Sequence, residues 1–410
     1  MLWQPSLSDH YTRMPADEAA HEISQRRAQL GESLVILGHH YQTDEVIRHA
    51  DFTGDSLKLS QLAAQVARTR PVRHVVFCGV HFMAETADML TPEHVEVILP
   101  DLSAGCSMAD MADYDDTLQA WDAVHGALAA QGWSGRVVPV TYVNSTAAIK
   151  AFVGQHGGAC CTSSNADAVF DWAMRGGESP GSGDDVKILF LPDQHLGRNT
   201  AAKYGIDTAA HTCVYDPRLT KRGEPLGGAT PEQVLASRVI LWAGHCSVHK
   251  LFRPEHCAAI RKENAERARH GLEPTRILVH PECAKEVVDL ADDSGSTEYI
   301  INTVRNSPPG SSWAIGTENH LVNRLADEGA ARGVHVRILS DCQCLCTTMY
   351  RIDQPHLLWV LDNLCGVGTK DNAPKAVNVI RVHPEVRALA LRALDRMLSL
   401  GSARPTLPVD

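Results

Sequence analysis

Short runs of β-branched and other apolar residues alternate along the chain with longer amphipathic stretches. Runs such as 34–37, 75–78 and 137–140 have the length of a buried strand, and the stretches that follow them carry apolar residues at helical spacing. This alternation is typical of βαβ units, in which helices connect parallel strands. The pattern therefore predicts an α/β protein.

The pattern recurs in three thirds of the chain, and each third ends at a cysteine just past a strand. These positions are Cys106, Cys246 and the group Cys342, Cys344 and Cys346. Ligands of parallel sheets collect at the carboxyl ends of the strands, where the polar clusters of this sequence also fall. We therefore expect three similar αβα units with small parallel sheets, whose strand ends share one site at the centre.

This repeat divides the chain into four regions. Three αβα units are expected over 21–112, 113–247 and 248–346, followed by a C-terminal helical region and tail over 347–410. The Gly/Pro-rich segment near 208–231 is predicted to be an insertion that caps or flanks the site. A last helix over 383–400 is expected to pack on the first unit.

Composition narrows the class of protein. A length of 410 residues with 44% apolar and 21% charged residues fits a multi-domain globular chain. The net charge of −11, without a basic stripe, argues against nucleic acid as a partner. No apolar run approaches the length of a membrane span, and the N-terminus lacks the apolar core of a signal peptide, so a cytoplasmic protein is expected. Its 12 cysteines should then be reduced thiols, some of them metal ligands.

Eight short motifs, in order, resemble those of quinolinate synthases. The resemblance covers about 34–349 and rests on Gly38-His39-His40-Tyr41-Gln42, Ala50-Asp51-Phe52-Thr53-Gly54-Asp55-Ser56, Met83-Ala84-Glu85-Thr86, Thr141-Tyr142-Val143-Asn144-Ser145, Thr162-Ser163-Ser164-Asn165, Leu191-Pro192-Asp193, His280-Pro281-Glu282-Cys283 and Gly295-Ser296-Thr297. It implies three αβα units around a pseudo-threefold axis. It also implies an enzyme of NAD biosynthesis that condenses iminoaspartate with dihydroxyacetone phosphate to give quinolinate.

The resemblance further implies a [4Fe–4S] cluster held by one cysteine from each unit, and Cys106, Cys246 and Cys346 match those positions. Three thiolates on four irons leave one iron open as a Lewis acid. Each cysteine alone is more simply read as a small buried hydrophobe, and zinc is the next metal to consider. Spacing does not choose among the last three cysteines. Cys342 and Cys344 would then be free thiols within disulfide reach.

Several polar residues are expected to bind substrate. His39, Tyr41, Tyr142 and Asn144 follow strands, and Ser56, Ser163, Ser164, Ser296 and Thr297 stand at helix starts, where hydroxyls and free N–H groups seat phosphate or carboxylate. Each of these hydroxyls can also be a plain N-cap. Glu282 is the expected general base with His280 as its partner, and Tyr41 and Tyr142 are expected to move protons.

Two other functions fit part of the pattern. Another [4Fe–4S] hydro-lyase would use the same open iron on a hydroxy acid. An iron–sulfur redox sensor would use the clustered cysteines 342–346, but it should carry a partner-binding element, and no basic helix is evident. For the synthase, a functional link to an enzyme that produces iminoaspartate is expected.

Overall fold

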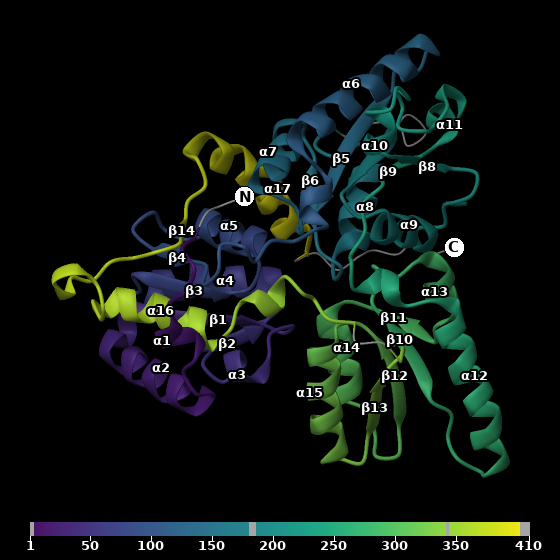
Figure 1. The fold of residues 1–410 in the computed structure, drawn as a ribbon. Coiled ribbons are helices and arrows are strands. Elements are labelled where there is room, and N and C mark those ends of the chain that lie inside the picture. Colours follow the sequence, from purple (N-terminus) through teal and green to yellow (C-terminus); the bar gives the residue numbers. More distant parts are fainter. Residues whose placement is uncertain (1–3, 180–185, 342–343, 402–410) are drawn as a thin grey trace. The chain divides into compact units, whose positions relative to one another are not determined.

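The computed structural model describes residues 4–179, 186–341 and 344–401, and three small sheets organise it (Figure 1). Most strands are buried along their length, as expected when helices cover both faces of a parallel sheet. The described chain forms two compact units. The first comprises the described residues up to Cys106, Glu318–Leu321 and Leu345–His383, and the second comprises Ser107–Thr317, Val322–Cys344 and the described residues from Pro384.

The first compact unit contains a five-stranded sheet in the order β14-β4-β3-β1-β2, parallel except for β14. Its strands are β1 (Leu34–His39), β2 (Phe52–Gly54), β3 (His74–Cys78), β4 (Glu96–Ile98) and β14 (Val379–Ile380). Its helices are α1 (Asp9–Thr12), α2 (Ala16–Leu30), α3 (Asp44–Ile47), α4 (Ser56–Thr69), α5 (His81–Leu90) and α16 (Gln354–Cys365). Because α16 packs on α2 and β14 pairs with β4, the chain from Leu345 to His383 belongs to this unit and is no separate region.

The second compact unit contains two sheets, and the larger has the parallel order β6-β5-β7-β9-β8. Its strands are β5 (Arg136–Tyr142), β6 (Ala159–Cys161), β7 (Val186–Leu191), β8 (Thr212–Tyr215) and β9 (Val239–Trp242). The helices are α6 (Tyr114–Ala130), α7 (Ala147–Gln155), α8 (Ala166–Met174), α9 (Gln194–Lys203), α10 (Pro217–Thr220) and α11 (Pro231–Ala236). The segment 208–231 contains the edge strand β8 and helix α10, and its being an insertion stays a prediction.

The smaller sheet of the second unit has the parallel order β11-β10-β12-β13. Its strands are β10 (Arg276–Val279), β11 (Asp293–Ser294), β12 (Ser312–Gly316) and β13 (His335–Ile338). The accompanying helices are α12 (Pro254–Arg269), α13 (Lys285–Leu290), α14 (Thr297–Arg305) and α15 (Asn319–Ala330). Helices accompany each of the three sheets, which confirms the predicted fold class of three αβα units. The pseudo-threefold axis stays a prediction. No helix among the described residues is long and apolar enough to cross a membrane.

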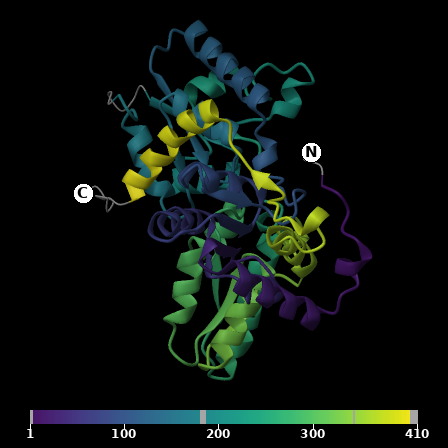
Figure 2. The same ribbon diagram turned by 90° about the vertical axis from the view of Figure 1, so that its left-hand side faces the viewer.

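The C-terminal helix α17 (Pro384–Gly401) packs on α7, β6 and α8, so its predicted place on the first αβα unit was wrong (Figures 1 and 2). Small residues allow a close approach between the two helices. A Cβ atom at Gly154 of α7 would lie 2.0 Å from the carbonyl oxygen of Leu389. Ala390 and Ala393 are fully buried in α17. An amphipathic pattern predicts that a helix has a buried face, but it does not name the surface that covers that face.

The repeat seen in the sequence has a counterpart in local geometry. Asp51 accepts the N–H of Ile36 at 2.7 Å in the first sheet, and Asp292 accepts the N–H of Ile277 at 2.6 Å in the third, each across 15 residues. An arginine pairs with each aspartate: Arg27 with Asp51 and Arg261 with Asp292. The first and third sheets therefore share the same arrangement of an aspartate that accepts a strand N–H and pairs with an arginine.

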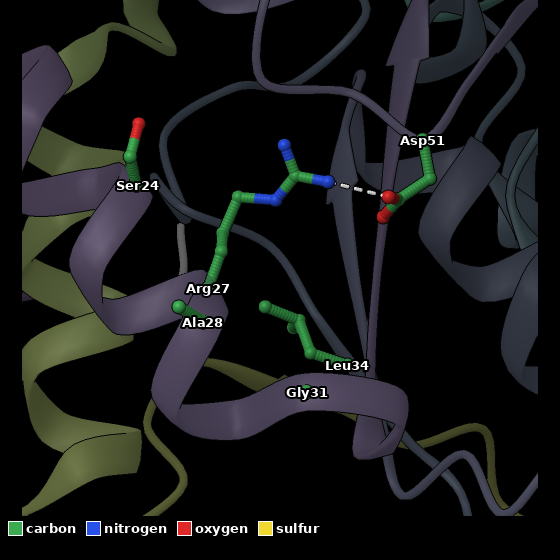
Figure 3. A pocket seen from close by; sticks show the side chains of 6 residues that line it. All are labelled: Ser24, Arg27, Ala28, Gly31, Leu34 and Asp51. Atoms are coloured by element: carbon green, nitrogen blue, oxygen red, sulfur yellow. Dashed lines mark hydrogen bonds and ion pairs between the residues drawn. The ribbon is translucent and has the colours of Figure 1, made fainter.

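A cavity of about 320 Å³ is lined in part by the Arg27–Asp51 ion pair (Figure 3). Leu34, which lines it, is the first residue of β1, whereas His39 is the last. The cavity therefore lies at the amino end of the strand, away from the predicted substrate residues, and Asp51 there is already paired with Arg27.

Candidate active site

The second compact unit buries a carboxylate, Glu282, against two histidines. His249 Nδ1 lies 2.9 Å from Glu282 Oε2, and His249 Nε2 lies 3.1 Å from the Thr317 hydroxyl. Because a carboxylate only accepts, His249 donates from Nδ1 to Glu282, and its Nε2 lies within hydrogen-bond distance of the Thr317 hydroxyl. The His280 ring stacks on His249 with centroids 4.5 Å apart. Thr317, His249 and Glu282 thus form one hydrogen-bonded chain.

The turn after β10 also fixes the tautomer of His280. Its Nδ1 accepts the backbone N–H of Glu282 at 3.3 Å, so the neutral ring carries its proton on Nε2. Burial, together with His249, lowers the pKa of His280 to about 3, which keeps the ring neutral. The first unit repeats this turn, because His39 Nδ1 accepts the backbone N–H of Tyr41 at 3.1 Å.

Glu282 is ionised despite its burial. Burial alone would raise its pKa, but the neighbouring His249 and His280 rings and hydrogen bonds from His249 and Tyr142 outweigh burial and lower the pKa below its ordinary value. Tyr142, the last residue of β5, is 5% exposed. The predicted residues Tyr142, His280 and Glu282 therefore meet, brought together by the carboxyl ends of β5 and β10.

A cysteine thiol lies beside this carboxylate. One ligand atom each of Cys246, His249 and Glu282 lies within 4.8 Å of the other two. Cys246 follows β9, and its backbone N–H points at the carboxyl group of Asp193, which N-caps α9. Burial and the nearby Glu282 raise the pKa of Asp193 well above its ordinary value. Acid, imidazole and thiol groups thus converge at the strand ends of two sheets.

The three predicted cluster cysteines occupy equivalent turns. Each stands three residues before a short 3₁₀ helix, namely Ala109–Met111, His249–Leu251 and Met349–Arg351. Cys106, Cys246 and Cys346 are partly accessible, whereas Cys344 is buried with its sulfur 3.2 Å from the Ser340 hydroxyl. Cys342 lies outside the described residues.

The remaining predicted residues of the first unit also lie at strand ends. The rings of His39, the last residue of β1, and Tyr41 meet edge to face with centroids 4.7 Å apart. Ser56 begins α4 after the N-cap Asp55, whose side chain accepts the N–H of Lys58. Because these residues belong to the other compact unit, their place relative to Glu282 stays a prediction.

In the second unit, the predicted anion-binding hydroxyls stand at helix starts, as expected. Ser296 N-caps α14 by accepting the N–H of Tyr299 at 3.3 Å, and Thr297 follows it. Ser163 and Ser164 precede α8, and the Ser164 hydroxyl lies 2.8 Å from that of Thr162. Ser296 therefore acts as an N-cap, and its hydroxyl group can still donate a hydrogen bond to a ligand. Asn144 lies two residues past the end of β5 and is partly accessible.

Sequence reasoning missed His249, Thr317 and Asp193. His249 follows Cys246 in a Cys-x-x-His pattern, and Thr317 comes directly after β12, a position that the strand-end rule covers. Asp193 ends the motif Leu191-Pro192-Asp193, and the sequence assigns it no separate role. Their partners are far away in sequence, so only the fold shows that they contact the site.

The fold and site define a class of protein: an α/β enzyme with buried acid–base groups next to a possible metal-binding thiol. A family model described as quinolinate synthetase A protein matches residues 21–399. Similar curated proteins are quinolinate synthases of Acidobacterium capsulatum (50% identical, covering 96% of this chain and 95% of the relative) and Rhodopirellula baltica (48%, covering 95% and 93%). The chain belongs to the quinolinate synthetase A family.

Proposed function

We propose that this chain is a quinolinate synthase that condenses iminoaspartate with dihydroxyacetone phosphate to give quinolinate, phosphate and two waters. The observation that carries this proposal is the ionised, buried Glu282 beside Tyr142, His249 and Cys246. The reaction needs several proton transfers at one site, and these groups are suited to them. Family membership supports the same assignment.

The proposed cofactor is a [4Fe–4S] cluster held by Cys106, Cys246 and Cys346. The donor set fits, because the three thiols are partly accessible and stand in equivalent turns, whereas Cys344 is buried. When bound through three thiolates, such a cluster supplies one iron without a protein ligand, which is a Lewis acid.

Glu282 is the proposed general base. Its lowered pKa means that it is ionised at neutral pH and so has no proton of its own, while His249 orients the carboxylate and Thr317 orients His249. Tyr142 hydrogen bonds to the same carboxylate and is able to pass a proton between it and substrate. His280 presents Nε2–H as a neutral donor.

The other predicted residues would hold the two substrates. His39, Tyr41 and Asn144 are proposed to bind polar groups of iminoaspartate, with Tyr41 also moving protons. Hydroxyls at helix starts are proposed to hold phosphate or carboxylate, because N–H groups at a helix N-terminus attract anions. These are Ser56, Ser163, Ser164, Ser296 and Thr297. We also propose that the enzyme acts in the cytoplasm and receives iminoaspartate from the enzyme that makes it.

The test is formation of quinolinate by the anaerobically reconstituted protein from iminoaspartate and dihydroxyacetone phosphate. We expect quinolinate and inorganic phosphate in equal amounts, with no product when either substrate is omitted. Dehydration of a hydroxy acid without quinolinate would instead identify a different hydro-lyase and contradict the proposal.

A further inference from the structure

Helix α9 contacts two separate turns of the candidate active site. At its start, Asp193 Oδ1 accepts the N–H groups of His195 at 2.7 Å and Leu196 at 2.9 Å. The same carboxyl group also faces the backbone N–H of Cys246. Asp193 therefore caps the helix and faces the Cys246 turn at the same time.

Backbone hydrogen bonding also joins the start of α9 to the Cys246 turn. Asp193 forms a parallel bridge with Gly244, and the N–H of Gln194 donates to the Gly244 carbonyl at 3.0 Å. A Cβ atom at Gly244 would lie 2.1 Å from the carbonyl oxygen of Pro192, so no side chain fits there without separating the turns. Cys246 is thus placed by the start of α9 as well as by its own strand.

Farther along the same helix, Asn199 holds the turn of Glu282. Its side-chain amide donates to the carbonyl of Pro281 at 2.8 Å and to that of Cys283 at 2.9 Å, the residues on either side of Glu282. Asn199 is only 9% exposed, so water cannot readily replace both hydrogen bonds. One planar amide therefore fixes the backbone from which the Glu282 carboxylate projects.

We infer that the segment Asp193–Asn199, the α9 brace, fixes Glu282 relative to Cys246, and that Asp193, Gly244 and Asn199 are positioning residues. The inference rests on the proposed function, in which Cys246 is a cluster ligand and Glu282 the base. Because β9 and β10 belong to different sheets, their pairing does not hold the two turns together, and the His249–Glu282 hydrogen bond is a side-chain link only. The brace joins them through one short helix.

The Glu282 end of the brace is tested by Asn199→Ala. We expect kcat to fall by at least about tenfold, since a misplaced base loses proton transfer, with KM for both substrates within about twofold and iron content unchanged. Asn199→Ser keeps one donor and should fall between wild type and Asn199→Ala. The matched control is Asn264→Ala, because Asn264 makes two similar hydrogen bonds to Thr275 away from the site. Wild-type kcat in a folded Asn199→Ala or Asn199→Ser would overturn this part.

The Cys246 end is tested by iron content after anaerobic reconstitution. Gly244→Ala and Asp193→Ala should each bind less than about half of the wild-type iron, because both separate the thiol from its place in the donor set. Asp193→Asn keeps an oxygen acceptor and should recover most of the iron. The control is Gly126→Ala in α6, where an added Cβ has nothing within 4 Å. Full iron in Gly244→Ala would overturn the inference.

Two parent variants separate a failure of the brace from a failure of the proposed function. If Cys246→Ser keeps its iron or Glu282→Gln keeps its turnover, the proposed ligand or base is wrong. Suppose that Cys246→Ser loses its iron and Glu282→Gln loses its turnover, while the Asn199 and Gly244 variants behave as wild type. Only the inference about the α9 brace is then wrong.

Discussion

The exposed fraction of Glu282 is only 3%, and two donors hold its carboxylate, so this residue gives the most direct test of the chemistry. Glu282→Gln removes the base but keeps the volume and one acceptor oxygen. We expect quinolinate formation to fall by at least about 100-fold while iron content and the visible absorption of the cluster stay at wild-type values. Near-normal turnover would reject Glu282 as the base. Glu286→Gln, at an exposed position four residues later, is the control.

His49 gives a prediction about stability in acid. Burial, with the charges of Arg27 and Arg48, lowers its pKa from 6.5 to about 4. Between these pH values the unfolded chain binds a proton that the folded chain does not, so stability falls as pH falls from 6.5 towards 4. At pH 5 the loss from this residue should be about 2 kcal/mol relative to pH 7.

The measurement is urea unfolding of the wild type and His49→Gln at both pH values. The variant should lose about 2 kcal/mol less between pH 7 and pH 5, because glutamine does not titrate. His270→Gln, at an exposed position, should match the wild type. An equal pH dependence in wild type and His49→Gln would show that His49 is not held neutral.

At the scale of elements, the helix starts carry a prediction about phosphate. The pair Ser296→Ala with Thr297→Ala, or the pair Ser163→Ala with Ser164→Ala, should raise KM for dihydroxyacetone phosphate about tenfold, because each pair removes hydroxyl donors to an anion. Thr230→Ala removes a real N-cap from α11 and should leave KM unchanged. An unchanged KM in both double variants would show that these hydroxyls do not bind the phosphate of the substrate.

The sequence predicted elements well where an apolar run was unbroken. Such runs make up most of β1, β3, β5 and β7. Because these strands are buried, the alternation of apolar runs with amphipathic stretches was enough to locate them. The edge strand β8 escaped notice because glycines and prolines surround it and two of its four residues are only partly buried. The packing of α17 was also missed, since its face of small residues has no complement that is visible in the sequence.

The sequence predicted only part of the candidate site. Strand-end positions predicted that Tyr142, His280 and Glu282 lie near one another, because parallel strands present their carboxyl ends together. His249 was missed because its role depends on two hydrogen bonds, to Glu282 and to Thr317, across 33 and 68 residues. Contacts of such long range follow from the pairing order of the sheets, which periodicity does not determine.

At the scale of the whole molecule, the proposed cluster ligands come from regions that are far apart in sequence. Two of these ligands, Cys106 and Cys346, belong to the first compact unit and Cys246 to the second. Assembly of the proposed cluster is therefore a test of the whole chain as well as of each thiol.

We expect Cys106→Ser, Cys246→Ser and Cys346→Ser each to lose most of the iron and all quinolinate formation after anaerobic reconstitution, because a cluster with two thiolates left is poorly held. Cys344→Ser should keep both, since its buried sulfur contacts Ser340 and not the accessible turn that Cys346 shares with the other two ligands. Iron per chain and absorption spectra measure the outcome. Full iron in Cys346→Ser, with loss in Cys344→Ser, would transfer the third ligand to Cys344. It would also show that the common turn before the 3₁₀ helix does not identify a ligand.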